Sequence, residues 1–258
     1  MAIVNVTPDS FFAGSRTPDA AAVEERVREV VAAGCDMIDV GGYSSRPGAA
    51  EVSPDEEWER VAAGIAAVRR LVPDMPVSVD TFRAEVARRA LESFGELIIN
   101  DISAGELDPS IVDVVAAHDA PYVAMHMRGT PATMQGLAQY DDVTEEVVRY
   151  FRERIGLLRS RGVRRLVLDP GFGFAKTLDQ NYELLRGLHR LCELGCPVLA
   201  GVSRKSMIYK VLDTTPDGAL AGTVALGWEC LRQGAAVLRV HDVREAIDTV
   251  RIFNRFNA

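Results

Sequence analysis

Short runs of Val, Ile and Leu alternate with longer amphipathic segments along the whole chain. Runs rich in β-branched residues predict strands, and apolar residues spaced three or four apart predict helices packed by one face. The expected strands cover residues 2–6, 36–40, 77–79, 97–99, 122–125, 166–168, 198–200 and 236–239. The expected helices cover residues 19–33, 54–71, 83–91, 109–118, 143–161, 178–194, 220–233 and 243–256.

Signals at the helix ends support this assignment. Ser53 stands before Pro54, with Glu56 three residues after the Ser, a pattern typical of a capped helix start. Gly34, Gly162 and Gly234 follow three of the expected helices, where a left-handed glycine commonly ends a helix.

Eight β/α units with short connections predict a parallel sheet that closes into a (β/α)8 barrel. An open, doubly wound sheet is the main alternative, but it would gather polar signatures at a single crevice, whereas here they follow every strand. No linker or low-complexity stretch interrupts the chain, so we expect one domain over residues 1–258.

The overall charge limits the partners of the protein. A formal charge of -8 argues against bulk binding to nucleic acid or to an anionic membrane. No run of apolar residues approaches the length of a membrane span. The four cysteines form no C-x-x-C pair, and we interpret them as free thiols of a cytoplasmic protein.

Polar residues stand at the end of every expected strand, and in a barrel these ends share the face that holds the active site. Asp39 and Asp101 are interpreted as turn or cap residues, the usual role of a lone Asp. For His126 the sequence leaves two interpretations open, packing inside the fold and lining a pocket. The remaining candidates are Asn5, Asp9, Asp80, Asn100, Asp169, Ser203, Lys205, Arg239 and His241, together with the loop 41–48.

These candidates divide by charge. Asp80, Asn100 and Asp169 offer acceptors suited to the amino-pyrimidinone edge of a heterocycle. Cationic donors suited to a phosphate or diphosphate leaving group come from Arg46, Lys205, Arg239 and His241. Asn5 and Asp9 supply hard oxygens of the kind that Mg2+ prefers.

Seven motifs in order resemble the dihydropteroate synthases along nearly the whole chain. They begin at Asn5 (NVTPDSF), Asp39 (DVGGYSSRPG), Ser78 (SVDT), Asn100 (ND), Asp169 (DPGFGF), Gly201 (GVSRKS) and Arg239 (RVH). The resemblance implies that a dihydropterin diphosphate is joined to p-aminobenzoate in folate biosynthesis.

The resemblance also implies individual roles. Asp80, Asn100, Asp169 and Lys205 would bind the pterin, and Asn5 would hold Mg2+. Ser45, Arg46, Arg239 and His241 would bind the diphosphate, and Phe11, Pro47, Phe174 and Ser203 would shape the p-aminobenzoate pocket. The residues expected to carry the chemistry are Asp80, Lys205, Asp9 and Arg46. A homodimer through the last helices is also implied.

The chain departs from the family pattern at a few positions. Ser45 replaces Thr, Tyr43 replaces Glu, and Ala2 and Ala175 replace Gly. The family's usual N-terminal extension is expected to be missing, because the first expected strand begins close to Met1.

Two other functions fit part of the pattern. A methyltetrahydrofolate-dependent methyltransferase of the same pterin-binding family would keep the acidic residues but would not need Arg46, Lys205 and Arg239. A catalytically silent paralogue that only binds pterin or a protein partner is the second alternative, although its loops and cations would not need to be intact.

Overall fold

The computed structural model describes residues 1–7, 20–44 and 51–258. The strands are β1 (Ala2–Asn5), β2 (Ile38–Gly41), β3 (Val77–Asp80), β4 (Ile98–Asp101), β5 (Tyr122–Met125), β6 (Leu166–Asp169), β7 (Leu199–Ala200) and β8 (Val237–Leu238). The α-helices are α2 (Ala20–Ala32), α3 (Pro54–Leu71), α4 (Ala84–Phe94), α5 (Ser110–Ala117), α6 (Val143–Ser160), α7 (Leu178–Arg186), α8 (His189–Cys192), α9 (Ser206–Tyr209), α10 (Leu220–Arg232) and α11 (Val243–Phe256).

All strand pairs are parallel, and the sheet closes on itself. Strands β1 to β6 form one continuous sheet, and β7 pairs with β8. Two single bridges join these two parts, Leu168 to Val198 and Ala2 to Val240. The strands therefore form the predicted (β/α)8 barrel, with one seam between β6 and β7 and another between β8 and β1.

The register of the strands separates two layers of side chains. Val4, Val40 and Val79 point away from the barrel axis and belong to the main core between strands and helices. Their neighbours along each strand point into the barrel, because side chains alternate along a strand. Asn5 pairs with Gly41, Gly41 with Asp80, and Asp80 with Asn100, so these four residues lie at one level near the carboxyl ends.

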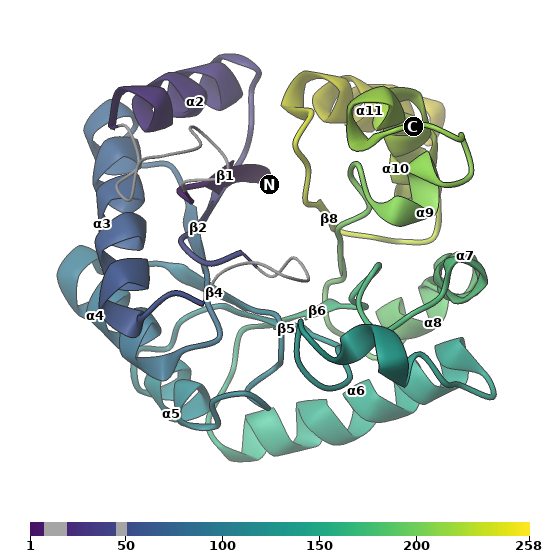
Figure 1. Ribbon diagram of the computed structural model, residues 1–258, viewed down its shortest axis with the longest axis horizontal. Helices are drawn as coiled ribbons and strands as arrows, with labels where there is room; N and C mark the ends of the chain where they lie inside the picture. The colour runs from purple at the N-terminus through teal and green to yellow at the C-terminus, as the bar shows by residue number, and fades with distance from the viewer. Residues whose placement is uncertain (8–19, 45–50) are drawn as a thin grey trace.

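The helices form a ring around the strands, with α2 and α11 on the two sides of the β8–β1 seam (Figure 1). Each helix buries one face against the barrel, as the spacing of its apolar residues predicts. In the described ranges, none of the helices is both long and apolar enough to cross a membrane.

The predicted helix ends are confirmed where they can be checked. Ser53 accepts a hydrogen bond from the backbone N–H of Glu56 at 3.2 Å. Gly34, Gly162 and Gly234 have φ angles of +93°, +93° and +99°. Such angles are costly for any residue with a Cβ, and they allow each chain segment to leave its helix.

The helix expected over residues 178–194 is wrong as a single element. It is divided into α7 and α8, with Gly187 after the last residue of α7. A Cβ at Gly187 would lie 2.5 Å from the Thr144 side chain, so the close approach to α6 requires glycine. Glycine is also a poor helix residue, and the helix ends there.

Candidate active site

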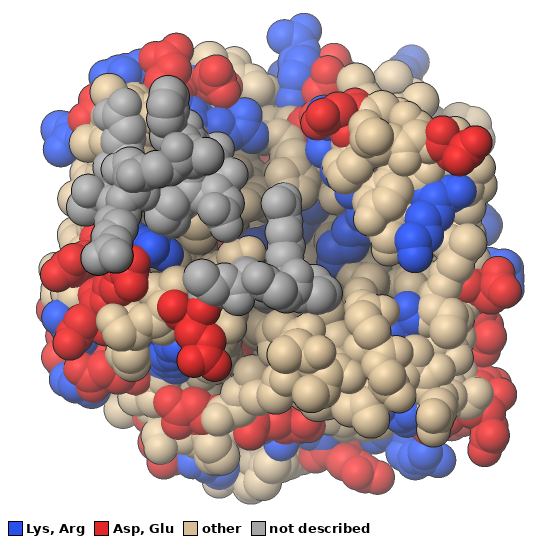
Figure 2. Space-filling model, in the orientation of Figure 1, with Lys and Arg blue, Asp and Glu red and all other residues tan. Residues whose placement is uncertain are grey.

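Those candidate residues that the structure describes gather at the carboxyl end of the barrel and come from six of its β/α units. Asn5, Asp80, Asn100 and Asp169 stand in or at the end of β1, β3, β4 and β6, and Phe174, Ser203, Lys205, Arg239 and His241 follow β6, β7 and β8. Asp9, Phe11, Ser45, Arg46 and Pro47 lie outside the described residues. Figure 2 shows Lys and Arg side chains in the hollow at the centre of this view.

Arg239 links two carboxylates inside the barrel. Its Nε donates to Asp39 Oδ2 at 2.7 Å, and its second guanidinium nitrogen donates to Asp80 Oδ2, also at 2.7 Å. The Asn100 amide nitrogen lies 3.2 Å from the same Asp39 oxygen. The sequence candidates Asp80, Asn100 and Arg239 are thus brought into one network, and Asp39 connects them.

A second charged pair lies beside this network. Asp169 is almost fully buried and accepts a hydrogen bond from the Gly171 N–H at 2.8 Å. Lys205 donates to the Phe172 carbonyl at 2.5 Å, and its ammonium lies 5.0 Å from the centre of the Phe174 ring. Lys205 and Phe174, predicted to serve different substrates, are therefore neighbours. A ligand against Lys205 would also meet the aromatic ring.

Burial changes the protonation of these groups. Burial raises the pKa of Asp80 to about 7, although Arg239 opposes this effect. Burial also raises the pKa of Asp169, against the opposing charge of Lys205. The pKa of Lys205 is lowered by burial to about 8, with Asp169 opposing the shift. Asp80 and Lys205 therefore titrate close to neutral pH.

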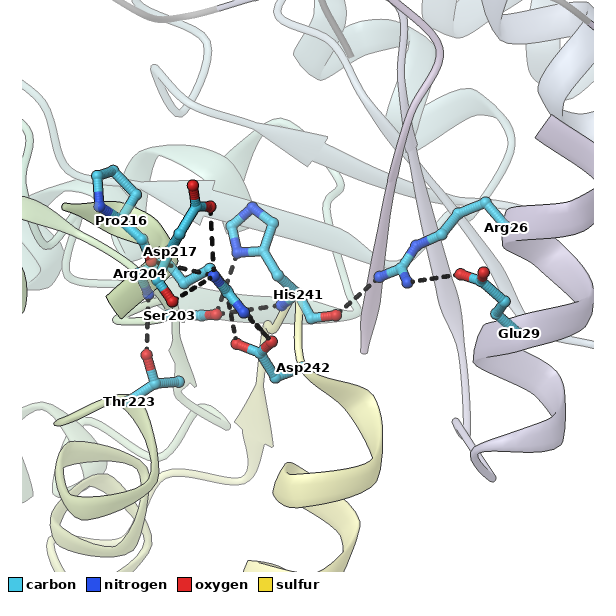
Figure 3. Close-up of polar contacts among 9 residues, drawn as sticks. All are labelled: Arg26, Glu29, Ser203, Arg204, Pro216, Asp217, Thr223, His241 and Asp242. Atoms are coloured by element: carbon cyan, nitrogen blue, oxygen red, sulfur yellow. Dashed lines mark hydrogen bonds and ion pairs between the residues drawn. The ribbon is translucent and has the colours of Figure 1, made fainter. Parts of the chain in front are cut away.

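Ser203 and His241 are held together by the loops after β7 and β8 (Figure 3). Ser203 Oγ lies 3.0 Å from His241 Nδ1 and accepts the His241 backbone N–H at 3.1 Å. Burial, followed by the charge of Arg239, lowers the pKa of His241 to about 4. The structure therefore indicates a neutral imidazole at neutral pH, where sequence reasoning expected a cation.

Arg204 fixes the position of these two loops. It has a φ of +54°, which turns the chain sharply between Ser203 and Lys205. Its guanidinium binds Asp242 at 2.6 Å and the Pro216 carbonyl at 3.0 Å (Figure 3). Across the β8–β1 seam, Arg26 of α2 donates to the His241 carbonyl at 2.7 Å.

Of the two candidate metal ligands, Asn5 and Asp9, the structure describes Asn5. A Cβ at Gly41 would lie 3.3 Å from Asn5 Oδ1 and 3.5 Å from Asp80 Cβ, so the two side chains flank this glycine. In the described part of the chain, no group of three or more His, Cys, Asp or Glu residues is placed to hold a metal. One amide oxygen suits Mg2+, because that ion commonly takes few protein ligands and completes its shell with water and phosphate oxygens.

Sequence reasoning did not select Lys176, which lies in the loop after β6 that also carries Phe174. The buried Lys176 ammonium has three acceptors at 3.0 Å, which are His126 Nδ1 and the carbonyls of Gly171 and Phe174. His126 is buried and packs edge-on against Tyr150, and it also lines a pocket with Met127 and Arg128. Both alternatives left open for His126 therefore apply. The only sequence signal for Lys176 was its position two residues after Phe174, the last residue of the DPGFGF motif.

Comparisons with known proteins agree with this geometry. The model of the "Pterin binding enzyme" family matches residues 1–241. A dihydropteroate synthase of Synechocystis sp. is 45% identical over 246 residues, which cover 94% of this chain and 84% of that protein.

Two solved structures share the fold of the chain. The dihydropteroate synthase of Xanthomonas albilineans with 4-aminobenzoic acid has a TM-score of 0.91 and 41% identity, covering 100% of this chain and 92% of the other. The Yersinia pestis dihydropteroate synthase in a sulfonamide drug complex has a TM-score of 0.93 and 37% identity, covering 100% and 93%. By sequence and by structure, the chain belongs to the family of pterin-binding enzymes that contains these dihydropteroate synthases.

Proposed function

We propose that the protein is a dihydropteroate synthase. It joins 6-hydroxymethyl-7,8-dihydropterin diphosphate to p-aminobenzoate and releases 7,8-dihydropteroate and diphosphate. The observation that carries this proposal is the network at the barrel mouth, where Asp80, Asn100 and Asp169 lie beside Lys205 and Arg239. In this reading, the whole of residues 1–258 is one pterin-binding domain.

The two kinds of side chain serve the two parts of the pterin substrate. The carboxylates and the amide accept the N–H groups of the pterin ring, and Lys205 donates to its acceptors. The bond between the pterin methylene and the diphosphate oxygen breaks, and the electron pair leaves with that oxygen. Arg239 and Arg46 stabilise the charge that develops on the diphosphate, which lowers the barrier to departure. His241 adds a neutral N–H donor.

The arylamine then completes the reaction. Departure of the diphosphate leaves an electron-poor methylene, whose positive charge is stabilised by the nearby carboxylates Asp80 and Asp169. The nitrogen lone pair of p-aminobenzoate forms the new C–N bond, and the nitrogen loses a proton to solvent. Phe174, beside Lys205, packs against the arylamine ring, and Ser203, Phe11 and Pro47 complete this pocket. Asp9 contributes to the same reaction centre.

We propose that Asn5 would hold Mg2+ at the diphosphate site. When bound, it would neutralise part of the charge of the leaving group. Asn5 supplies the protein oxygen, and Ser45 lies on the loop expected to contact the same diphosphate. Support comes from the position of Asn5 beside Asp80 at the mouth of the barrel.

An assay for diphosphate release tests the proposed reaction. Release should depend on both the pterin diphosphate and p-aminobenzoate, with 7,8-dihydropteroate formed in equal amount. EDTA should suppress release and excess Mg2+ should restore it. Methyl transfer from methyltetrahydrofolate without diphosphate chemistry would support the methyltransferase instead, and binding of pterin without turnover would indicate the silent paralogue.

We also propose that sulfonamides compete with p-aminobenzoate, because both are anilines with a polar group at the far end of the ring. The relative from Yersinia pestis that was solved with such a drug supports this. A cytoplasmic location is proposed on the basis of four free cysteines.

A homodimer through the last helices is a further part of the proposal. Large apolar side chains are exposed in this region, with Ile252 63% and Phe256 77% exposed on α11. Exposed apolar patches of this kind mark interfaces in many proteins. Sedimentation velocity should show a dimer that Phe256→Asp dissociates. The matched control Leu157→Asp, at an exposed position on α6, should leave the dimer intact; a wild-type monomer would contradict the proposal.

A further inference from the structure

Asp39 is buried in β2, and its carboxylate serves other parts of the barrel. Its oxygens accept hydrogen bonds from the Asn100 amide nitrogen at 3.2 and 3.4 Å and from Arg239 Nε at 2.7 Å. Both partners are distant in sequence, on β4 and after β8. Among the described residues, this carboxylate makes no hydrogen bond to the turn that follows β2.

Asp101, the other Asp interpreted as a turn residue, has a different role. Its carboxylate accepts from the N–H groups of Ser103 and Gly105 at 2.8 and 2.6 Å, from Ser103 Oγ at 2.8 Å and from Tyr122 Oη at 2.6 Å. These bonds fix the turn after β4 on the outer side of the sheet. Asp101 therefore confirms the turn interpretation, whereas Asp39 does not.

The carboxylate of Asp39 determines which way the Asn100 amide points. A carboxylate only accepts hydrogen bonds, so the amide must present its nitrogen to Asp39. The amide oxygen is then directed elsewhere, and it receives no hydrogen bond from the described residues. In the proposed function this oxygen is the atom that accepts an N–H of the pterin.

The same carboxylate holds the guanidinium of Arg239. One edge of that planar group is bound to Asp39 and another nitrogen to Asp80, so the fork has a single orientation between β2 and β3. Asp39 and Arg239 also compensate each other's charge, which is essential for a carboxylate with 0% exposure.

We propose that Asp39 is a positioning residue for the pterin substrate, which turns the Asn100 amide oxygen toward the ligand and holds Arg239 against Asp80. This inference rests on the proposed function, because it takes the pterin as the ligand of Asn100. Asp39 itself contacts no substrate, and its effect passes through its two partners.

The inference predicts a specific rescue. Asp39 Oδ2 accepts from both Arg239 Nε and the Asn100 nitrogen, and Oδ1 lies 3.4 Å from the same nitrogen. In Asp39→Asn, the new amide keeps its oxygen on Arg239 and places its NH2 at the Oδ1 position. There it faces the NH2 of Asn100, and the contact between two donors rotates the Asn100 amide. In Asn100→Asp, two carboxylates face each other without a proton between them. In the double variant, the new amide on β2 donates to the new carboxylate on β4, and Arg239 keeps its acceptor. The second oxygen of that carboxylate then faces the pterin as an acceptor. The net charge of the three groups is again that of the wild type.

Calorimetric titration with 6-hydroxymethylpterin tests this prediction. Each single variant should raise the Kd at least about tenfold, because a buried polar group is then mispaired next to the bound ligand. The double variant should bind within about threefold of the wild type, so that the two changes are strongly non-additive. In turnover, the single variants should raise KM for the pterin substrate while KM for p-aminobenzoate stays the same.

Asp101→Asn is the matched control, another buried Asp at a strand end. It should lower the melting temperature and leave the Kd for the pterin probe unchanged. Circular dichroism confirms that each variant is folded. A folded Asp39→Asn with wild-type Kd, or a double variant that binds as weakly as the sum of the single changes predicts, would overturn the inference. If the wild-type protein bound no pterin, the proposed function would fail instead.

Discussion

At the scale of single residues, Asp169 offers a direct test of ligand recognition. One of its oxygens already accepts the Gly171 N–H, and the side chain is almost fully buried. Asp169→Asn would set an N–H against the N–H groups of the pterin, at a cost of about 1–3 kcal/mol. We expect the Kd for 6-hydroxymethylpterin to rise at least about tenfold, measured by calorimetry. If the folded variant bound the pterin with wild-type affinity, Asp169 would have only a structural role in the turn after β6.

The shifted pKa values of Asp80 and Lys205 predict a narrow pH optimum. Below a pH of about 7, Asp80 becomes protonated and is no longer a charged acceptor, because its pKa is raised to about 7. Above a pH of about 8, Lys205 loses its proton, because its pKa is lowered to about 8. The profile of kcat/KM for the pterin substrate should therefore be bell-shaped between these values.

Lys205→Arg is the informative variant for this profile. A guanidinium stays protonated in proteins, so the alkaline limb of the kcat/KM profile should disappear up to a pH of about 10. This is expected even if the variant is slower than the wild type at every pH. The acid limb should remain, because Asp80 is unchanged. An alkaline limb that stays in place in this variant would mean that another group titrates there.

Asp39 and Asp101 show how far single residues could be predicted from the sequence. Both are Asp residues near a strand end, and both were interpreted as turn formers. Strand alternation places Asp39 on the same face as Asn100 and places Asp101 on the opposite face, toward Tyr122. Alternation alone could have separated them. The link from Asp39 to Arg239 could not be predicted, because it depends on how closely β8 approaches β2 across the barrel.

At the scale of elements, Arg204 and Asp242 connect the loops after β7 and β8. Asp242→Asn should weaken this connection, since a charged hydrogen bond contributes about 1.5–3 kcal/mol. We expect a lower melting temperature and a higher KM for both substrates, because Ser203, Lys205 and His241 are held by these loops. Calorimetry and steady-state kinetics measure the two effects.

Glu29→Gln provides the control for this pair. Glu29 binds Arg26 at 3.2 Å on the surface, with 56% of its side chain exposed. Such pairs contribute less than about 1 kcal/mol, so this variant should keep both KM values. Unchanged kinetics in Asp242→Asn would show that the two loops hold their positions without the ion pair.

The position and number of the long elements were largely predictable, whereas their interruptions were not. The apolar spacing within α3 and α6 identifies them from the sequence, and the cap at Ser53 fixes where α3 begins. The break at Gly187 depends on contact with Thr144 of α6, which a local pattern cannot reveal. The short helix α9 after Lys205 was missed for a similar reason, because four residues are too few for a periodic pattern.

At the scale of the whole molecule, the two seams are the weakest parts of the barrel. Strands β1 to β3 pair through registers of four residues, whereas β6–β7 and β8–β1 are joined by single bridges. Amide hydrogen exchange should be faster at the seams, at Ile3, Leu168 and Val240, than at Val40 and Val79. Mass spectrometry or NMR can measure this, and equal protection in both regions would show that the barrel opens only as a unit.

The β8–β1 seam also has a consequence for how the protein is made. The ribosome completes β1 first, yet the partner that covers its free edge, Val240, is synthesised more than 230 residues later. At about 5–20 residues per second, that edge waits on the order of 10–50 s. An uncovered strand edge is a template for pairing with another chain. During this interval the nascent protein can aggregate through β1, and a chaperone that covers the edge would favour the closed barrel. In refolding experiments, low protein concentration should have the same effect.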